Sequence, residues 1–180
     1  MTTRFELRGI NHLALVCRDM ATTVAFYEGV LGMRLTKTIE IFGGGQHFFF
    51  DCGNGDSLAF FWFPDAAPAA PGIAAPAHRP DQGDMTSAHG SMNHVAFDVP
   101  AEAIDGYVQK LRDAGVPCTD VANHDDSEFG IADDLYPGVF VRSIYFQDPD
   151  GILLEFASWT RPLTAADVSH EPRHAVVAPD

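Results

Sequence analysis

Two histidines in matching sequence contexts are the residues of this chain best suited to bind a metal ion. Segment 11–14 reads Asn-His-Leu-Ala and segment 93–96 reads Asn-His-Val-Ala, so His12 and His94 occupy the same place in two copies of one pattern. A neutral imidazole is a common metal ligand. The alanine that shares a strand face with each histidine leaves room beside the ring.

One carboxylate lies inside an otherwise apolar run near the end of the chain. Glu155 is the acidic residue of segment 152–157, and a carboxylate is costly to bury unless it is paired, hydrogen-bonded or bound to a metal. If the two halves pack about a pseudo-twofold axis, His12 and His94 approach each other across a shared sheet and Glu155 completes a metal site. Two histidines and one carboxylate with open positions suit Fe(II), and less selectively Mn(II), Ni(II), Co(II) or Zn(II).

The elements that must position these residues occur twice. Each half reads strand, helix and three strands, and such a repeat is the first guide to the fold. The first half is predicted as strand 10–17, helix 19–31 and strands 33–42, 46–52 and 57–63. The second half is predicted as strand 92–99, helix 101–114 and strands 117–123, 140–147 and 152–159. The first helix is expected to begin at an Asp19 N-cap and to end before Gly32.

The repeat predicts an α+β protein made of two βαβββ modules. The modules are expected at residues 8–64 and 91–160, and a segment rich in Pro and Ala, 65–90, links them. Residues 161–180 are polar and contain proline, so we expect an arm or a frayed tail.

The composition excludes several classes of partner. The chain of 180 residues carries 11 Lys and Arg against 25 Asp and Glu, a formal charge of −14, which argues against nucleic-acid and anionic membrane partners. No apolar run reaches the roughly 20 residues that span a bilayer. The first eight residues lack the apolar core of a secretory signal, and three cysteines imply no disulfide framework. We therefore predict a cytoplasmic protein.

Together the motifs resemble the vicinal oxygen chelate superfamily, which includes glyoxalase I, extradiol dioxygenases, methylmalonyl-CoA epimerase, and fosfomycin and bleomycin resistance proteins. The two Asn-His strands, segment 25–33 and segment 143–156 carry the resemblance, which covers residues 8–160. It implies paired βαβββ modules whose mixed sheets form a cup around a divalent metal, usually in a homodimer.

The resemblance assigns ligand positions to the first and last strand of each module. His12 matches the first position, His94 the third and Glu155 the fourth. The second falls near segment 59–61, where the sequence Ala-Phe-Phe offers no ligand. This departure argues against the four-ligand site of glyoxalase I and the epimerase. It matches the pattern of extradiol dioxygenases and of some resistance transferases.

A further signature resembles that of the extradiol dioxygenases. It joins Ile144 and Tyr145 through Asp-Pro-Asp-Gly at 148–151 to Glu155. The resemblance implies that Tyr145 hydrogen-bonds an oxygen of the metal-bound substrate. We therefore predict a metal-dependent oxidoreductase of ring-cleaving type, with Fe(II) as its metal, that acts with O2 on a small aromatic, catechol-like substrate.

The histidines that handle protons in that family are missing. Residues 136–138 and 60–62 stand where they are expected. His47 and His124 are candidate catalytic substitutes, because an imidazole titrates near neutral pH. Alternatively, His47 is an outward-facing strand residue and His124 belongs to a solvated acidic loop.

Two other functions stay open at this point. A glyoxalase-like lyase or isomerase, or a thiol transferase, would keep the divalent metal and need no O2. A ligand-sequestering protein of the resistance type would bind an apolar molecule in the cup without catalysis. The aromatic residues 48, 50, 60, 62 and 140 are candidates for a pocket wall, although most are expected in the core. Arg142 either faces away from the cup or anchors an anionic substrate.

Overall fold

The computed structural model describes residues 8–70, 76–83 and 85–173. Residues 1–7, on which the prediction about export depends, lie outside this part. So do residues 71–75 and 84 of the predicted linker and residues 174–180 of the tail. Within the described residues, no helix is both long and apolar enough to cross a membrane.

The first module contains one four-stranded mixed sheet. Its strands are β1 (His12–Val16), β2 (Leu35–Glu40), β3 (Gln46–Gly53) and β4 (Asp56–Trp62), and their order across the sheet is β1-β4-β3-β2. β1 runs parallel to β4, and the other pairs are antiparallel. Helix α1 (Met20–Val24) continues as a π-helical segment, η1 (Ala25–Val30), and a 3₁₀ turn, η2 (Phe42–Gly44), precedes β3.

Local sequence signals account for the ends of the first helix and for one tight turn. The Oδ1 atom of Asp19 accepts a hydrogen bond from the backbone N–H of Thr22 at 2.7 Å, which confirms the predicted N-cap. Gly32 follows the helix with φ +73°, a conformation that favours glycine. Asn54 and Gly55 both have positive φ between β3 and β4, as a two-residue hairpin turn requires.

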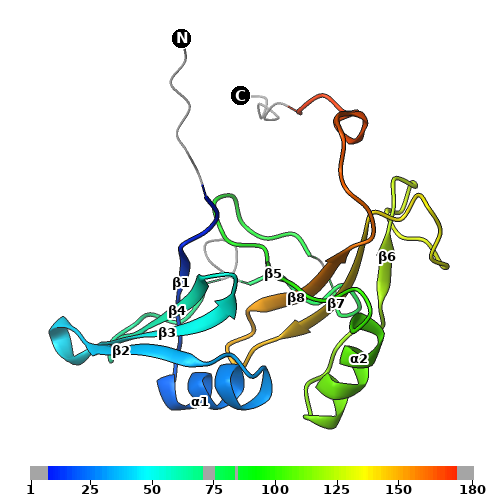
Figure 1. The fold of residues 1–180 in the computed structure, drawn as a ribbon. Helices are drawn as coiled ribbons and strands as arrows, with labels where there is room; N and C mark the ends of the chain where they lie inside the picture. The colour runs from blue at the N-terminus through cyan, green and yellow to red at the C-terminus, as the bar shows by residue number, and fades with distance from the viewer. Residues whose placement is uncertain (1–7, 71–75, 84, 174–180) are drawn as a thin grey trace, which may run out of the picture.

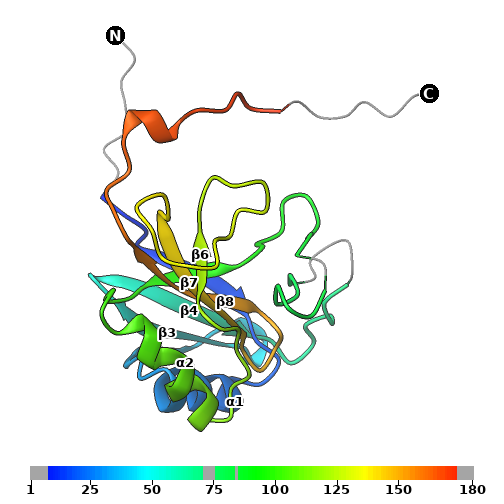
Figure 2. The ribbon, with the colours of Figure 1, turned by 90° about the vertical axis from the view of Figure 1, so that its right-hand side faces the viewer.

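The second module repeats this topology. Its elements are β5 (Val95–Asp98), α2 (Ile104–Asp113), β6 (Ala122–His124), β7 (Val141–Gln147) and β8 (Leu153–Trp159), with strand order β5-β8-β7-β6. The two sheets confirm the predicted α+β class and the repeated module. A 3₁₀ turn, η3 (Ala165–Asp167), lies in the tail, which leads away from the sheets (Figure 2).

The strand predicted at 117–123 is wrong over most of its length, because only Ala122–His124 pair as β6. Pro117 has no N–H to donate to a ladder. The side chain of Thr119 accepts a hydrogen bond from the backbone N–H of Tyr145 at 3.0 Å, while its own N–H donates to the Tyr145 carbonyl. A side chain therefore occupies a place in the hydrogen-bonding pattern that backbone groups of a longer strand would fill.

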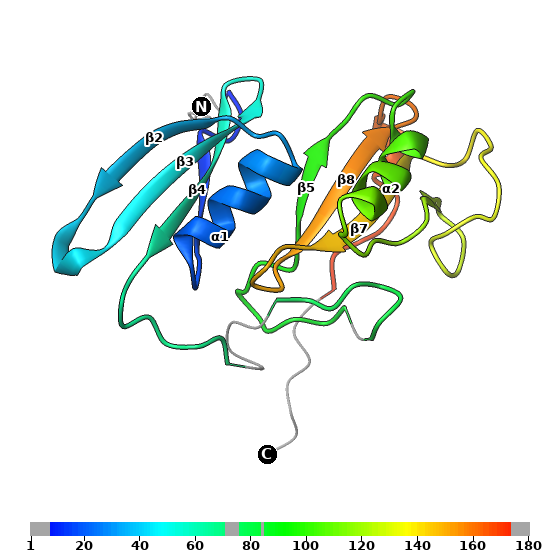
Figure 3. The ribbon, with the colours of Figure 1, turned by 90° about the horizontal axis from the view of Figure 1, so that it is seen from below.

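Both helices lie below the sheets in Figure 1, and the view from below shows them on the side of the sheets that faces the viewer (Figure 3). One hydrophobic cluster includes residues of both modules, among them Tyr27, Phe60, Ile104 and Ile144. The modules therefore share a core on the helix side. The opposite faces of the two sheets carry the polar candidate residues.

The turn before β8 docks against the first helix. The buried hydroxyl of Tyr27 donates a hydrogen bond to Oδ2 of Asp148 at 3.1 Å, and burial of this carboxyl raises its pKa. Nearby, Arg18 pairs with Asp150 at 3.4 Å between nitrogen and oxygen. The Tyr27 contact is buried, whereas the Arg18 side chain is exposed, so we expect the first to contribute more to stability.

Tyr27→Phe is expected to lower the free energy of unfolding by about 1 to 3 kcal/mol, since it removes the donor to Oδ2 of the buried Asp148, while Oδ1 keeps the backbone N–H groups of Asp150 and Ile152. Urea denaturation followed by circular dichroism measures this change. Tyr107→Phe is the control, because the Tyr107 ring packs against Phe156 and is only partly buried. Equal losses in the two variants would contradict the role given to the hydroxyl.

Candidate metal centre

The predicted ligands His94 and Glu155 meet on the open face of the second sheet. The two atoms in contact, His94 Nε2 and Glu155 Oε2, are 2.9 Å apart. β5 and β8 run parallel with Ala96 opposite Glu155, so a small side chain leaves space where the imidazole reaches the carboxylate. His94 and Ala96 lie on one face of their strand by period-two alternation, and Ala96 is paired with Glu155, so the imidazole and the carboxylate share a face.

Glu155 is held as an anion although only 5% of its surface is exposed. Burial opposes its ionisation, but hydrogen bonds from His94 and Ser143 outweigh that penalty and lower the pKa of the carboxyl. The Ser143 hydroxyl donates to Oε1, the oxygen that His94 does not contact. Ser143 was missed in the sequence, although its alternation with Tyr145 on one strand could have indicated it.

Tyr145 and His124 form a second pair beside the first. The Tyr145 hydroxyl and His124 Nε2 are 3.2 Å apart, and Tyr145 lies directly across the ladder from Glu155. Burial, followed by the charge of Glu155, raises the pKa of Tyr145 to about 12, so its phenol is neutral at physiological pH. The rings of His94 and Tyr145 meet edge to face at 5.9 Å. The four side chains therefore form one continuous polar cluster.

His12 and His47 lie on the other sheet. His12 is exposed at the start of β1, and its Nδ1 is 2.8 Å from Oδ1 of Asn11. The ring of His47 stacks on Phe61 with centroids 3.6 Å apart, and its Nδ1 is 3.1 Å from the Phe60 carbonyl oxygen. Among the described residues of one chain, no group of three or more His, Cys, Asp or Glu gathers in a metal-binding arrangement. The structure thus brings together His94 and Glu155 but not His12.

The other candidates fall mainly on the helix side. Phe50 and Phe60 are fully buried, and Phe48 and Trp62 pack against the same core. Arg142 forms a bidentate ion pair with Asp105 at 2.6 and 3.0 Å, which ties β7 to α2. Arg142 therefore faces away from the candidate centre.

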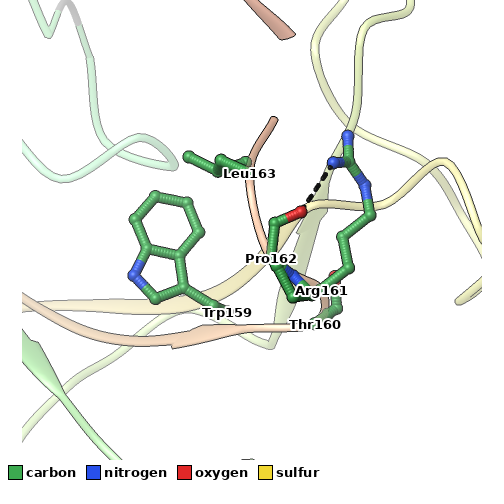
Figure 4. Close-up of a pocket in the computed structure, with 5 residues that line it drawn as sticks. All are labelled: Trp159, Thr160, Arg161, Pro162 and Leu163. Atoms are coloured by element: carbon green, nitrogen blue, oxygen red, sulfur yellow. Dashed lines mark hydrogen bonds between the residues drawn. The ribbon is translucent and has the colours of Figure 1, made fainter. Parts of the chain in front are cut away.

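A pocket lies farther along the open face, where β8 ends. Trp159 and Leu163 line it together with residues 160–162 (Figure 4). Trp159 shares a strand face with Glu155, since the two are four residues apart on β8. The pocket contains none of the predicted ligands, so it continues the open face and is not the candidate centre itself.

Comparison with known proteins shows to which family and to which relatives this chain is similar. A model of the Glyoxalase/Bleomycin resistance protein/Dioxygenase superfamily matches residues 9–156. The chain is 28% identical over 116 residues to the putative ring-cleaving dioxygenase MhqE of Bacillus subtilis, a match that covers 62% of this chain and 33% of that protein. It is 27% identical over 154 residues to the metallothiol transferase FosB of Lysinibacillus sphaericus, which covers 86% of this chain and 84% of the relative.

A solved structure gives the same fold. The fosfomycin resistance protein FosX of Listeria monocytogenes, in complex with Mn(II) and sulfate, matches with a TM-score of 0.53 and 18% identity. The match covers 86% of this chain and 95% of that one. At this identity the likeness shows the fold alone.

Proposed function

The chain belongs to the Glyoxalase/Bleomycin resistance protein/Dioxygenase superfamily, and from that premise we propose a divalent-metal enzyme that acts on a small oxygen-bearing molecule. His94, Glu155 and His12 would hold the metal. The observation that carries the proposal is the contact of 2.9 Å between His94 and the buried Glu155, with the Tyr145–His124 pair beside it. Loading of the protein with Mn(II), followed by isothermal titration calorimetry, tests the metal centre directly.

The donor set of the second sheet suits a cation. Oδ1 of Asn93 can only accept a hydrogen bond, so the Nδ1 atom of His94, 2.8 Å away, carries the proton. Nε2 of His94 is then free to act as a metal ligand beside the Glu155 carboxylate, and these two groups would hold a divalent cation. A divalent cation bound there would supply Lewis acidity for an oxygen atom of the substrate.

The third ligand would come from a second copy of the chain. His12 is exposed, and no cluster of three donors forms among the described residues of one chain. The shared core occupies the helix side, so the open faces of the sheets are available to a partner. Val16 and Trp159 lie on these faces with 51% and 56% of their surface exposed, so each open face carries an apolar side chain that a second copy would cover. In a twofold dimer each copy would lend His12 to the other.

The residues beside the metal can move a proton. The neutral phenol of Tyr145 is a donor, and His124 can return a proton to it across the 3.2 Å contact. The Nδ1 atom of His124 is 3.2 Å from the Gly130 carbonyl oxygen, which fixes the orientation of the ring. The hydroxyl of Ser143 holds the Glu155 carboxylate in place.

For the reaction we propose a non-oxidative transfer of a thiol to an electrophile such as an epoxide. This follows the metallothiol transferase relative, which matches most of both chains, whereas the match to MhqE spans a third of that protein. The thiol sulfur would attack carbon, the carbon–oxygen bond would break, and the oxygen would take up the proton from Tyr145. The thiol proton then restores Tyr145 through His124, so that the sum of the reactants equals the product.

Fosfomycin and L-cysteine are the first substrates to try with Mn(II)-loaded protein. We expect cysteine to be consumed in proportion to epoxide, equally with and without O2, and only when metal is present. If the reaction needs O2, or if cysteine is not consumed while Mn(II) is bound, thiol transfer to an epoxide is not the activity.

A ring-cleaving dioxygenase is the second candidate. The Tyr145–His124 pair supports it, because removal of protons from a catechol needs a group of this kind next to the metal. Fe(II) would be the required metal. Oxygen uptake by Fe(II)-loaded protein with a panel of catechols, together with a yellow product, would favour this reaction over thiol transfer.

Tyr145→Phe is expected to lower kcat by about 100-fold or more while Mn(II) affinity changes little, because the phenol donates a proton and is not a ligand. Steady-state kinetics and calorimetry on the same preparation separate the two effects. Tyr136→Phe is the control, since the Tyr136 hydroxyl is bound to Asp125 at 2.9 Å in the loop before β7. A Tyr145 variant with normal kcat would remove this residue from the mechanism.

A further inference from the structure

The segment between the modules packs onto the candidate centre. We call residues 76–83 and 85–93 the strap; it includes the second half of the predicted linker and leads into β5 (Figure 1). Ala77 of the strap is 2% exposed and forms an apolar cluster with Tyr145 and Leu153, against which Met85 also packs. The strap therefore covers the ring of Tyr145 and is more than a connection between modules.

Asn93 joins the strap to the ligand His94. Its amide nitrogen donates to the carbonyl oxygen of Met85 at 2.6 Å and to the hydroxyl of Ser87 at 3.1 Å. Its amide oxygen is 2.8 Å from Nδ1 of His94. One planar amide thus orients the imidazole with one end and holds the strap with the other.

The first module contains a natural comparison. Oδ1 of Asn11 is also 2.8 Å from Nδ1 of the following histidine, His12. Within the part of the chain that the structure describes, this is the one hydrogen bond of the Asn11 side chain. The two Asn-His pairs therefore share the contact to the ring and differ in the contact to the strap.

We propose that Asn93 is a positioning residue that couples the strap to the metal centre, so that metal binding at His94 makes the strap more rigid. The proposal rests on the proposed metal function of His94. If the His94 ring rotates toward a metal ion, the hydrogen-bonded amide of Asn93 either moves with it or resists the rotation. Because this amide is also hydrogen-bonded to Met85 and Ser87, a movement of the amide displaces the strap. Linkage then requires the reverse effect, in which an ordered strap increases metal affinity. Ala77 packs in one cluster with Tyr145 and Leu153, and Met85 packs against that cluster. The same coupling therefore holds the phenol of Tyr145, the proposed proton donor, in place.

Hydrogen–deuterium exchange of the whole protein, with and without saturating Mn(II), tests the coupling. In the wild type we expect Mn(II) to slow exchange of strap peptides several-fold. In Asn93→Ala the metal should no longer slow it, and Mn(II) affinity should fall about 10- to 100-fold, as when other groups that orient metal ligands are removed. Asn11→Ala is the matched control, and it should keep the metal-dependent protection of the strap at saturating Mn(II).

Two further measurements separate positioning from loss of structure. Ser87→Ala removes one strap contact of Asn93 without touching the side that faces His94, and an intermediate loss of protection is expected. The visible absorption spectrum of bound Co(II) should change in Asn93→Ala, because it reports ligand geometry. If Mn(II) binds to the wild type but strap exchange is the same with and without it, the coupling is refuted and the metal centre stands. If no Mn(II) binds to the wild type, both proposals fall.

Discussion

Glu155→Gln is expected to lower Mn(II) affinity by about 100-fold or more and to remove activity with it. The neutral amide keeps the shape of the side chain but loses the charge that attracts a cation, and one of its two ends becomes a donor that repels the metal. The wild-type carboxylate is buried yet ionised, with hydrogen bonds from His94 and Ser143 that favour the charged form. Calorimetric titration with Mn(II) measures the loss.

Ser143→Ala provides a graded comparison for this prediction. It removes the hydroxyl that contacts Oε1 of Glu155 and leaves both predicted ligands in place. We expect a loss of Mn(II) affinity of about tenfold, at the lower end of the range for residues that orient a ligand. A Glu155→Gln protein that binds Mn(II) as tightly as Ser143→Ala would show that the carboxylate is not a ligand.

Much of the fold follows from local signals in the sequence. The repeated Asn-His strands, the Asp19 cap and the Gly-containing turns predict two βαβββ modules, because each signal depends on residues close together in the chain. The region 117–121 was mispredicted for a related reason. The segment was predicted as a strand from its side-chain pattern. Pro117 lacks an N–H, and the Thr119 hydroxyl accepts the hydrogen bond of the Tyr145 N–H in place of a backbone carbonyl. A side-chain pattern contains no information about such hydrogen bonds.

The site shows the same division between local and distant contacts. Alternation along β5, β7 and β8 is enough to place His94, Tyr145 and Glu155 on one face. The position of His12 depends on how whole modules pack, and the structure puts the shared core on the helix side instead of bringing the two histidines together. The role of Asn93 was also beyond reach, since its partners Met85 and Ser87 lie in a segment whose composition indicates only a linker.

Mixing two inactive variants is expected to restore metal binding if His12 is supplied by a second copy. In a mixed dimer, one chain carries His12→Ala and the other carries Glu155→Ala. One site then takes its intact His12 from the Glu155→Ala chain and its intact His94 and Glu155 from the His12→Ala chain. The other site contains both substitutions. Random pairing makes half of the dimers mixed, so about a quarter of the wild-type sites should return. Either variant alone should bind Mn(II) weakly.

Co-expression of the two chains with different tags, followed by Mn(II) titration and activity assays, measures this recovery. The control mixes His94→Ala with Glu155→Ala. These residues lie in the same module, 2.9 Å apart, so every site of the mixed dimer lacks one of them and no recovery is expected. Recovery in the first mixture and none in the second requires that His12 act across the dimer. Failure of both, with dimers formed, would place all ligands within one chain and would require the two sheets to rearrange when metal binds.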